Sequence, residues 1–317
     1  MAIKINVADA NLDGKGINFA AYLKSFEKTY QDATSRGDFS GEITGSMGSS
    51  TYGAKSYVTT DSAEDGGRSV IFNSPDKFYY DFAGLEYPAH TIWGKLQSIV
   101  FGSDTVATTA GRPPNEYTIY TNSADVTITG FGKNFITTSQ DGEILDGIMN
   151  ASTAGLGALR AYLESDSIVF KGSTGNDVFT GYTHNDKLNG GAGNDKLSGA
   201  GGNDVLNGGA GNDTLNGDAG NDKLVGAAGN DKLTGGAGAD TFIFAKGAGT
   251  DKITDFEAGK AGKDIIEFAH GLFDNYADVL AHAKDTNAGV QISYDGGKLT
   301  LLDVEIADLH KGDFHIL

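Results

Sequence analysis

From Gly172 to Ile243 one apolar residue recurs at every ninth position, within eight successive repeats rich in glycine and Asn-Asp pairs. These residues are Phe179, Leu188, Leu197, Leu206, Leu215, Leu224, Leu233 and Phe242. The first six residues of a repeat predict a turn, because Gly and Asn tolerate positive φ, and the last three predict a short strand with its apolar residue inward. Two repeats complete a coil of about eighteen residues. Odd-numbered repeats should therefore stack on one edge and even-numbered repeats on the other.

An aspartate stands two residues before each apolar position. The eight are Asp177, Asp186, Asp195, Asp204, Asp213, Asp222, Asp231 and Asp240. Carboxylates stacked at the ~4.8 Å spacing of neighbouring strands repel one another strongly unless a cation neutralises them. Calcium takes about six to eight oxygen ligands, which stacked carboxylates and glycine carbonyls can supply. We expect these aspartates to bind Ca²⁺, with about six ions if every neighbouring pair is filled.

The repeat closely resembles the RTX family, whose nonapeptide G-G-x-G-x-D-x-U-x implies a calcium-dependent parallel β-roll. A metal-free glycine-rich solenoid or a flexible linker is the alternative, but a linker needs neither a fixed aspartate nor an inward leucine. His184 replaces the glycine expected at the fourth position of the second repeat, so we expect that turn to bind calcium weakly. The phenylalanines of the terminal repeats are expected to cap the roll.

The composition bounds the partners and the route of export. The chain has 317 residues, 42 acidic against 24 basic residues, a formal net charge of −18 and no cysteine. This charge argues against nucleic acid or an anionic membrane surface as partner. The first nine residues lack the apolar core of a signal peptide, and no stretch approaches the ~18–20 apolar residues of a membrane span. We therefore expect a soluble protein without classical export.

The sequence after the repeats continues the RTX resemblance. Residues 255–256 and 264–268 resemble the strand-rich cap that follows RTX arrays, and 291–302 predict a hairpin around Asp295-Gly296-Gly297. Residues 313–317 place an acidic residue before apolar ones, similar to uncleaved type I export signals. The resemblance implies export by a type I ABC transporter, folding in extracellular calcium, and three parts: 1–168, the β-roll 169–245, and the cap with its secretion signal, 246–317.

The N-terminal part has a different hydrophobic pattern. Residues 17–30 place apolar groups at helical spacing, and 143–163 predict a closing helical stretch. Short β-runs lie between them, at 57–60, 69–72, 77–82, 98–101, 116–120 and 126–128. The pattern predicts an α+β domain with an antiparallel sheet.

Within this domain, Tyr79-Tyr80-Asp81-Phe82 followed by the segment Pro88–Ser98 resembles the HasA-type hemophores, secreted proteins that capture haem. In that family a strand tyrosine is an axial ligand of the haem iron and a nearby histidine accepts its phenolic proton. The resemblance implies that Tyr80 is the ligand and His90 its partner, with Tyr79 and Tyr87 as alternative ligands. It also implies delivery of haem to an outer-membrane receptor.

The chain departs from the hemophore pattern in its first loop. Family members commonly supply a second axial histidine there, whereas residues 31–38 contain none. Arg36 of this loop is a candidate partner for a haem propionate, although an exposed arginine is more often simply solvated. The departure keeps alive a second interpretation, an RTX surface or matrix protein or enzyme with a degenerate domain that binds no haem. Because the chain has neither H-E-x-x-H nor G-x-S-x-G, we expect no enzymatic activity of those common classes.

Overall fold

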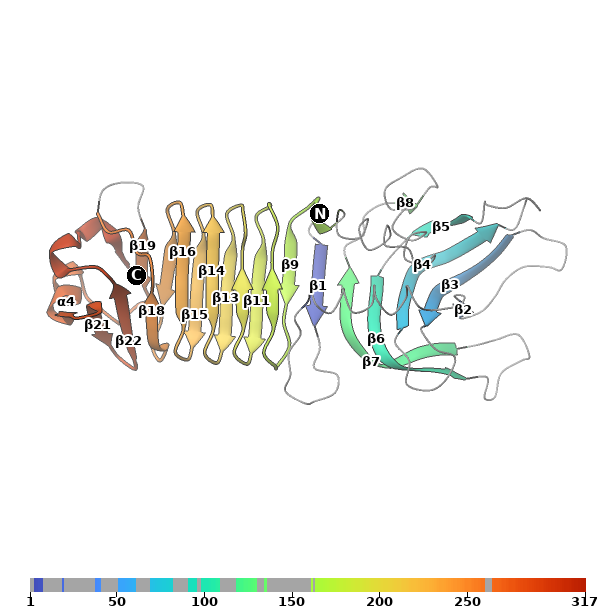
Figure 1. The fold of residues 1–317 in the computed structure, drawn as a ribbon, viewed down its shortest axis with the longest axis horizontal. Coiled ribbons are helices and arrows are strands. Elements are labelled where there is room, and N and C mark those ends of the chain that lie inside the picture. Colours follow the sequence, from blue (N-terminus) through green and yellow to red (C-terminus); the bar gives the residue numbers. More distant parts are fainter. Residues whose placement is uncertain are drawn as a thin grey trace. The chain divides into compact units, whose positions relative to one another are not determined.

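The computed structural model describes residues 163–259 and 264–317 continuously (Figure 1). Before residue 163 it describes the backbone of eight strands and the single residues Phe19 and Ala161. The chain divides into two compact units, residues 1–11 with 20–166 and residues 12–19 with 167–317. Each unit is therefore described by itself.

The first unit contains antiparallel strands. They are β1 (Ile3–Val7), β2 (Asp38–Ser40), β3 (Thr51–Thr60), β4 (Ser69–Asp81), β5 (Thr91–Lys95), β6 (Ser98–Thr108), β7 (Thr118–Thr129) and β8 (Asn134–Phe135). Their order is β2-β3-β4-β6-β7-β1, and β5 pairs with both β4 and β8. The β-runs predicted at 69–72 and 77–82 belong to one strand, β4, apart from residue 82. Both runs pair with β3, with a shift of register between them. Apart from Phe19, the predicted helix at 17–30 lies outside the described residues, as does most of that at 143–163.

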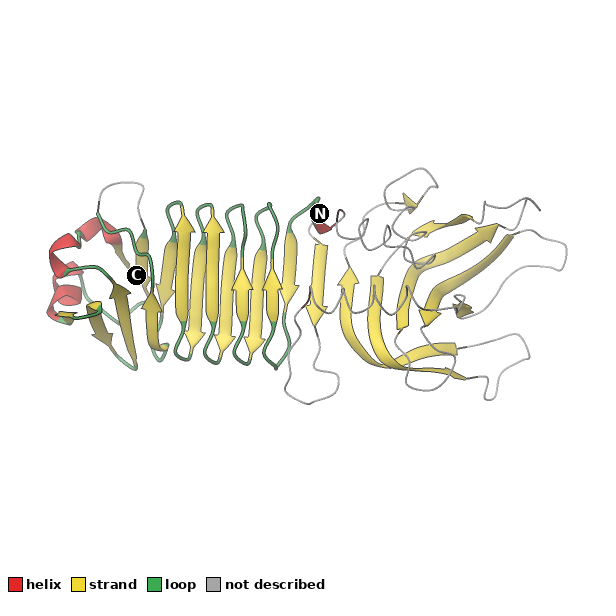
Figure 2. Cartoon of the chain, viewed as in Figure 1, coloured by secondary structure: helices red, strands yellow, loops and turns green. Residues whose placement is uncertain are grey.

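The second unit is a β-roll of two parallel sheets, drawn in yellow in Figure 2. Its strands are β9 (Ile168–Lys171), β10 (Val178–Thr180), β11 (Lys187–Ala192), β12 (Lys196–Ser198), β13 (Val205–Ala210), β14 (Thr214–Ala219), β15 (Lys223–Ala228), β16 (Lys232–Ala237) and β17 (Thr241–Phe244). Even-numbered repeats form one sheet and odd-numbered repeats the other. Each residue pairs with the one eighteen positions later, as Leu188 does with Leu206. The predicted two-repeat coil is thus confirmed.

One detail of the predicted coil is wrong. The sequence pattern predicts three-residue strands, but β11 and β13 to β16 each have six residues. The parallel ladder continues through the glycine pair, for example from Gly191 to Gly209, because nothing in these residues interrupts backbone pairing with the next coil. The turns are correspondingly shorter than six residues.

The inward apolar residues form the core of the roll. The repeated leucines and the two phenylalanines are at most 2% exposed. Burying a leucine side chain contributes roughly 1.5–3 kcal/mol, so a polar residue at Leu215 would remove one layer of the core. At the N-terminal end Phe170 stacks on Phe179 with 4.1 Å between ring centroids, and Phe19 lies 5.4 Å from Phe179. These rings form the apolar end of the core.

A small cap continues both sheets. Its elements are β18 (Gly249–Ile253), β19 (Ile265–Phe268), α4 (Tyr276–Ala281), β20 (Ala283–Thr286), β21 (Gly289–Tyr294), β22 (Gly297–Leu302), the 3-10 turns Ile306–Asp308 and Lys311–Asp313, and β23 (Phe314–Ile316). The predicted hairpin is confirmed, since β21 and β22 pair antiparallel with Tyr294 opposite Gly297. Asn275 caps α4 by accepting a hydrogen bond from the Asp278 N–H. Within the described part of the chain, no helix is long and apolar enough to cross a membrane.

Candidate functional site

The repeated aspartates form two continuous ladders along the edges of the roll. The backbone N–H of each aspartate donates to Oδ1 of the aspartate one coil later, as Asp195 does to Asp213 at 2.7 Å. All eight aspartates are at most 2% exposed. The predicted stacking of odd with odd and even with even aspartates is confirmed. The sequence did not predict that, from Asp186 onward, one oxygen of each carboxylate already accepts a hydrogen bond from the backbone one coil earlier.

The second carboxylate oxygen separates six of the aspartates from the other two. In the six from Asp195 to Asp240, Oδ2 is buried without a hydrogen-bond partner. In the first coil, by contrast, Oδ2 of Asp177 accepts from the N–H and hydroxyl of Ser173 at 2.7 and 2.9 Å, and Oδ2 of Asp186 accepts from the Tyr182 N–H at 2.9 Å. A buried unpartnered carboxylate oxygen is costly, so these six positions fit a cation.

Burial also makes these carboxylates hard to ionise without a cation. It is the main reason why the pKa of Asp195 and Asp204 is raised to about 7. The hydrogen bond that each carboxylate accepts from the backbone lowers the pKa, and the charges of neighbouring aspartates raise it. Burial likewise raises the pKa of Asp213 and Asp240 to about 6. The folded roll therefore holds a column of groups whose charged form needs a counter-ion.

Glycine at the first position of each repeat leaves room for these oxygens. A Cβ added to Gly190 would lie 2.1 Å from Oδ2 of Asp195 and 2.7 Å from the carbonyl oxygen of Gly208 in the next coil. The arrangement repeats at Gly199, where the Cβ would lie 2.2 Å from the carboxylate of Asp204. A carboxylate oxygen and a carbonyl oxygen from successive coils thus approach the same glycine. Calcium prefers these two oxygen types as ligands.

Backbone oxygens are needed to complete such a site. Among the described residues, no group of three His, Cys, Asp or Glu side chains is placed to hold a metal ion. Calcium accepts carbonyl ligands readily, whereas metals that prefer imidazole or thiolate do not fit this set of donors. The donor chemistry therefore favours calcium.

The first coil differs from the others in its turns. Glycines at the fourth repeat position adopt left-handed φ from Gly193 onward, for example 108° at Gly193 and 114° at Gly202. Gly175 and His184, which hold this position in the first coil, are not among the described residues with positive φ. In the repeat that contains His184, the Oδ2 of Asp186 already has a protein partner. Weak calcium binding by this turn stays a prediction.

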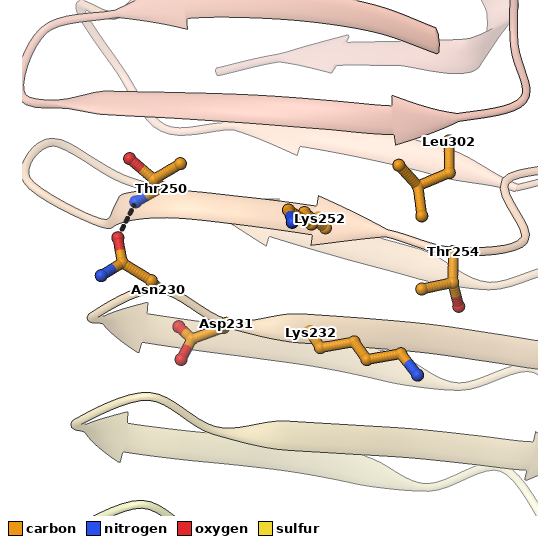
Figure 3. A pocket seen from close by; sticks show the side chains of 7 residues that line it. All are labelled: Asn230, Asp231, Lys232, Thr250, Lys252, Thr254 and Leu302. Carbon is orange, nitrogen blue, oxygen red and sulfur yellow. Dashed lines mark hydrogen bonds between the residues drawn. The ribbon is translucent and has the colours of Figure 1, made fainter. Parts of the chain in front are cut away.

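An asparagine precedes each of the first seven aspartates, and these asparagines form a second ladder outside the first. The N–H of Asn212 donates to Oδ1 of Asn194 in the preceding coil at 2.7 Å, opposite in direction to the aspartate ladder. Figure 3 shows the last member on this edge, where the Thr250 N–H donates to Oδ1 of Asn230 beside a surface hollow of about 400 Å³. The asparagines therefore fix the turns from the solvent side. From the repeat pattern alone, asparagine is expected here only because it tolerates positive φ.

Two further aspartates extend the ladders into the cap. Asp231 donates its N–H to Oδ1 of Asp251, and Asp240 donates to Oδ1 of Asp264, both at 3.0 Å. Burial raises the pKa of Asp251 to about 7 and that of Asp264 to about 6. Their spacings of 20 and 24 residues hide them from a search at period eighteen. The signal that could have revealed them is the buried apolar residue two positions later, Ile253 after Asp251 and Ile266 after Asp264.

Comparison with known proteins bears on this region directly. The model of the RTX calcium-binding nonapeptide repeat matches four overlapping segments, 169–197, 190–224, 198–233 and 216–251. Residues 169–251 are RTX calcium-binding repeats. The cation expected at the six unpartnered oxygens is thus calcium, and the parallel β-roll is the fold of these repeats. No curated protein matches the chain significantly.

Solved structures give more distant similarities. The apo hemophore HasA from Yersinia pestis is 16% identical, with 51% of this chain and 87% of that chain covered at a TM-score of 0.35. The holo form is 19% identical at the same TM-score. The extracellular lipase LipA from Serratia marcescens is 18% identical, with 47% and 40% covered at a TM-score of 0.27. At these TM-scores none of the three supports an argument about function.

The predicted haem residues lie largely outside the described part of the chain. Arg36 and His90 are not described, and neither is the alternative ligand Tyr87. Tyr80 and Tyr79 lie on β4, and the backbone pairs Tyr80 with Ile92 of β5. The haem assignment therefore stays a prediction.

Proposed function

We propose that this protein is a secreted RTX protein whose roll folds when calcium binds outside the cell. The observation that carries the proposal is the set of six buried Oδ2 atoms without a partner, from Asp195 to Asp240. Where calcium is scarce, these carboxylates oppose closure of the coils; where it is abundant, binding free energy becomes folding free energy. The roll thereby restricts folding to the extracellular side.

Bound calcium would supply positive charge between consecutive turns of one edge. The residues that would hold it are the Oδ2 atoms of neighbouring aspartates and the carbonyls of glycines such as Gly208. Both Oδ2 atoms are unpartnered in four consecutive pairs, Asp195–Asp213, Asp213–Asp231, Asp204–Asp222 and Asp222–Asp240. Four principal ions is therefore a better expectation than six.

Calcium titration of the full chain tests this proposal. Hydrogen exchange read out by mass spectrometry would follow residues 169–251 separately from the rest of the chain. We expect the repeats to exchange freely in chelator and to become protected as calcium rises. Equal protection in chelator and in calcium would contradict the proposal.

Export through a type I ABC transporter is the second part of the proposal. The C-terminal segment is integrated in the folded cap, since β23 pairs with β19 and the buried Asp313 accepts hydrogen bonds from the Gly259 and His310 N–H groups. Recognition of residues 313–317 by the transporter would therefore precede folding. Secretion of a chain lacking these residues through a reconstituted type I system measures this. Undiminished secretion would rule out the segment as the signal.

We further propose that residues 1–168 bind haem for delivery to a cell-surface receptor, with Tyr80 as iron ligand, His90 as its partner and Arg36 near a propionate. The support is the segment Pro88–Ser98 together with the register of β4 and β5. Asp81 of β4 pairs with Thr91 of β5. Tyr80 is the residue before Asp81, and His90 is the residue before Thr91. A tyrosine binds ferric iron as phenolate, and an adjacent base would favour that form.

Hemin titration of the full chain separates this role from its alternative. We expect a stoichiometric change in the visible spectrum that Tyr80→Phe abolishes and His90→Ala weakens, while Tyr79→Phe on the same strand serves as the matched control. An unchanged spectrum in the wild-type chain would favour an RTX surface or matrix protein, or an enzyme, with a degenerate domain. We propose a binding role and no catalytic one.

A further inference from the structure

Among the repeats from the third onward, one carries an acidic residue at its second position where the others have glycine or alanine. The second position of each repeat from the third onward adopts left-handed φ, and three of its occupants are not glycine: Ala200 (73°), Asp218 (70°) and Ala227 (70°). Asp218 is the charged member of this set. Left-handed φ is uncommon for a residue with a side chain, although Asp is enriched there, so its presence calls for a physical reason.

The Asp218 carboxylate ties two successive coils together. Its Oδ2 accepts from the Ser198 hydroxyl at 2.5 Å and from the Ala200 N–H at 3.2 Å, both in the preceding coil. Its Oδ1 accepts from Nδ2 of Asn216 in its own coil at 2.5 Å. Asn216 and Asp218 lie on β14, so these bonds join β14 to Ser198 of β12 and to Ala200 just after it. The turns that come next along the chain lead into Asp204 and Asp222.

Asp204 and Asp222 form one of the four pairs with unpartnered oxygens. They are 1% and 2% exposed, and Oδ2 of each lies against the first glycine of its repeat. At Gly199 the carbonyl oxygen of Gly217 joins Oδ2 of Asp204 at the place of the missing Cβ. Burial is the main cause of the raised pKa of both aspartates, and the negative charge of Asp218 raises it further. A third carboxylate thus acts on this pair.

The opposite edge provides a natural comparison. There the pair Asp213–Asp231 has the same unpartnered oxygens, but the corresponding left-handed residue is Ala227, which has no charge and cannot join the coils. The two sites thus share the unpartnered oxygens and the left-handed φ at this position, and the first has an additional carboxylate. Because calcium affinity rises with the charge and rigidity of its ligand set, the two sites should differ in affinity.

We propose that Asp218 is an additional calcium-binding determinant, which makes the Asp204–Asp222 site hold Ca²⁺ more tightly than the Asp213–Asp231 site. The inference rests on the proposed calcium-driven folding. Asp218 acts in two ways: it joins the two successive coils through hydrogen bonds, and it adds a negative charge to the carboxylates of this site. Ser198 is its positioning residue.

The test is a calcium chloride titration of the full chain followed by hydrogen exchange. The turns before Asp204 and Asp222 are compared with those before Asp213 and Asp231. In the wild type we expect the first set to become protected at lower calcium. Asp218→Asn, which removes the charge, should raise the calcium midpoint there about two- to fivefold, the effect of one partly exposed charge. The shift should shrink as sodium chloride is raised, because salt screens the charge.

Two further variants distinguish charge from backbone conformation. Asp218→Gly removes the charge but suits the left-handed φ, so a purely conformational role predicts an unchanged or lower midpoint, whereas our proposal predicts a higher one. Ala227→Asp, at the same φ of 70°, should lower the midpoint of the Asp213–Asp231 turns. An Asp218→Gly variant that titrates like the wild type would overturn the proposal. Calcium-independent protection in the wild type would instead refute calcium-driven folding itself.

Discussion

Asp213→Asn is the substitution whose effect follows most directly from the ladders. Asparagine keeps the Oδ1 that accepts from the Asp195 N–H, but it removes the charge that two neighbouring calcium positions share. Burial raises the pKa of Asp213 from 3.8 to about 6, and the charge of Asp231 adds to it. A shift of two units corresponds to roughly 3 kcal/mol against ionisation in the folded, calcium-free roll.

The expected result is a change of sign between two conditions. In chelator Asp213→Asn should stabilise the roll by up to about 3 kcal/mol, because no buried charge must form. In calcium it should raise the midpoint of folding about tenfold or more, since tenfold corresponds to about 1.4 kcal/mol and a shared ligand is lost. Hydrogen exchange in residues 169–251 of the full chain, measured in chelator and along a calcium titration, detects both effects: greater protection of the variant in chelator and a higher calcium midpoint.

Asp177→Asn is the matched control. Both oxygens of Asp177 are outside the set of unpartnered atoms, and its Oδ2 accepts from the Ser173 N–H and hydroxyl. Replacing that oxygen by an amide nitrogen should cost about 1–3 kcal/mol with or without calcium. If Asp213→Asn also lost stability in chelator, the reasoning would be refuted, because both carboxylates would then stabilise the roll through hydrogen bonds to the protein.

Three further predictions follow from the same geometry. In chelator the roll should gain protection against hydrogen exchange as the pH falls from 8 to 5. Burial raises the pKa of groups such as Asp195 in the folded roll above its unfolded value, so the stabilisation that comes from their protonation is complete below about pH 4 and lost as the pH rises through about 7. Protection that rises with pH would contradict this. Gly190→Ala should destabilise the calcium-bound roll by roughly 2–4 kcal/mol, because the added Cβ would clash with the oxygens of Asp195 and Gly208. Gly201→Ala is its control: the nearest atoms to the added Cβ lie 3.9 Å away, so this variant should unfold in urea like the wild type. Asn212→Ala removes the oxygen that accepts a hydrogen bond from the Asn230 N–H, which is exposed and can bond to water instead. The free energy of unfolding should therefore fall by at most about 1 kcal/mol. A larger loss would mean that the asparagine ladder stabilises the roll more than its exposure implies.

The architecture of the roll could be predicted because its period is uninterrupted. A leucine every nine residues determines which strands share a sheet, and the pairing of Leu206 with Leu224 follows from that count. The length of the strands could not be predicted in this way. Glycine is a turn residue by propensity, yet the parallel ladder carries Gly209 into a strand because the next coil supplies its pairing partner.

The candidate site was predicted only in outline. The eight aspartates were identified, but their division into six with a free oxygen and two without depends on hydrogen bonds from Ser173 and Tyr182 that no repeat count reveals. Asp251 was missed because the insertion before it changes the spacing. Asp218 was missed because a consensus treats a residue in place of glycine as a deviation rather than as a functional group. For the N-terminal unit, strand propensity found several strands but could not indicate that two runs belong to β4.

The register of the coils also limits how this protein can change in length. Each strand pairs with the one eighteen residues later, and the cap accepts the last strand of each sheet. Removing one whole coil would keep every downstream strand in its own sheet and both ladders continuous. Removing a single repeat would move each downstream strand, and the cap with it, to the opposite edge relative to the first coil. A change by whole coils, in steps of about eighteen residues, therefore keeps the cap in its present orientation relative to the first coil, and a change by one repeat reverses it.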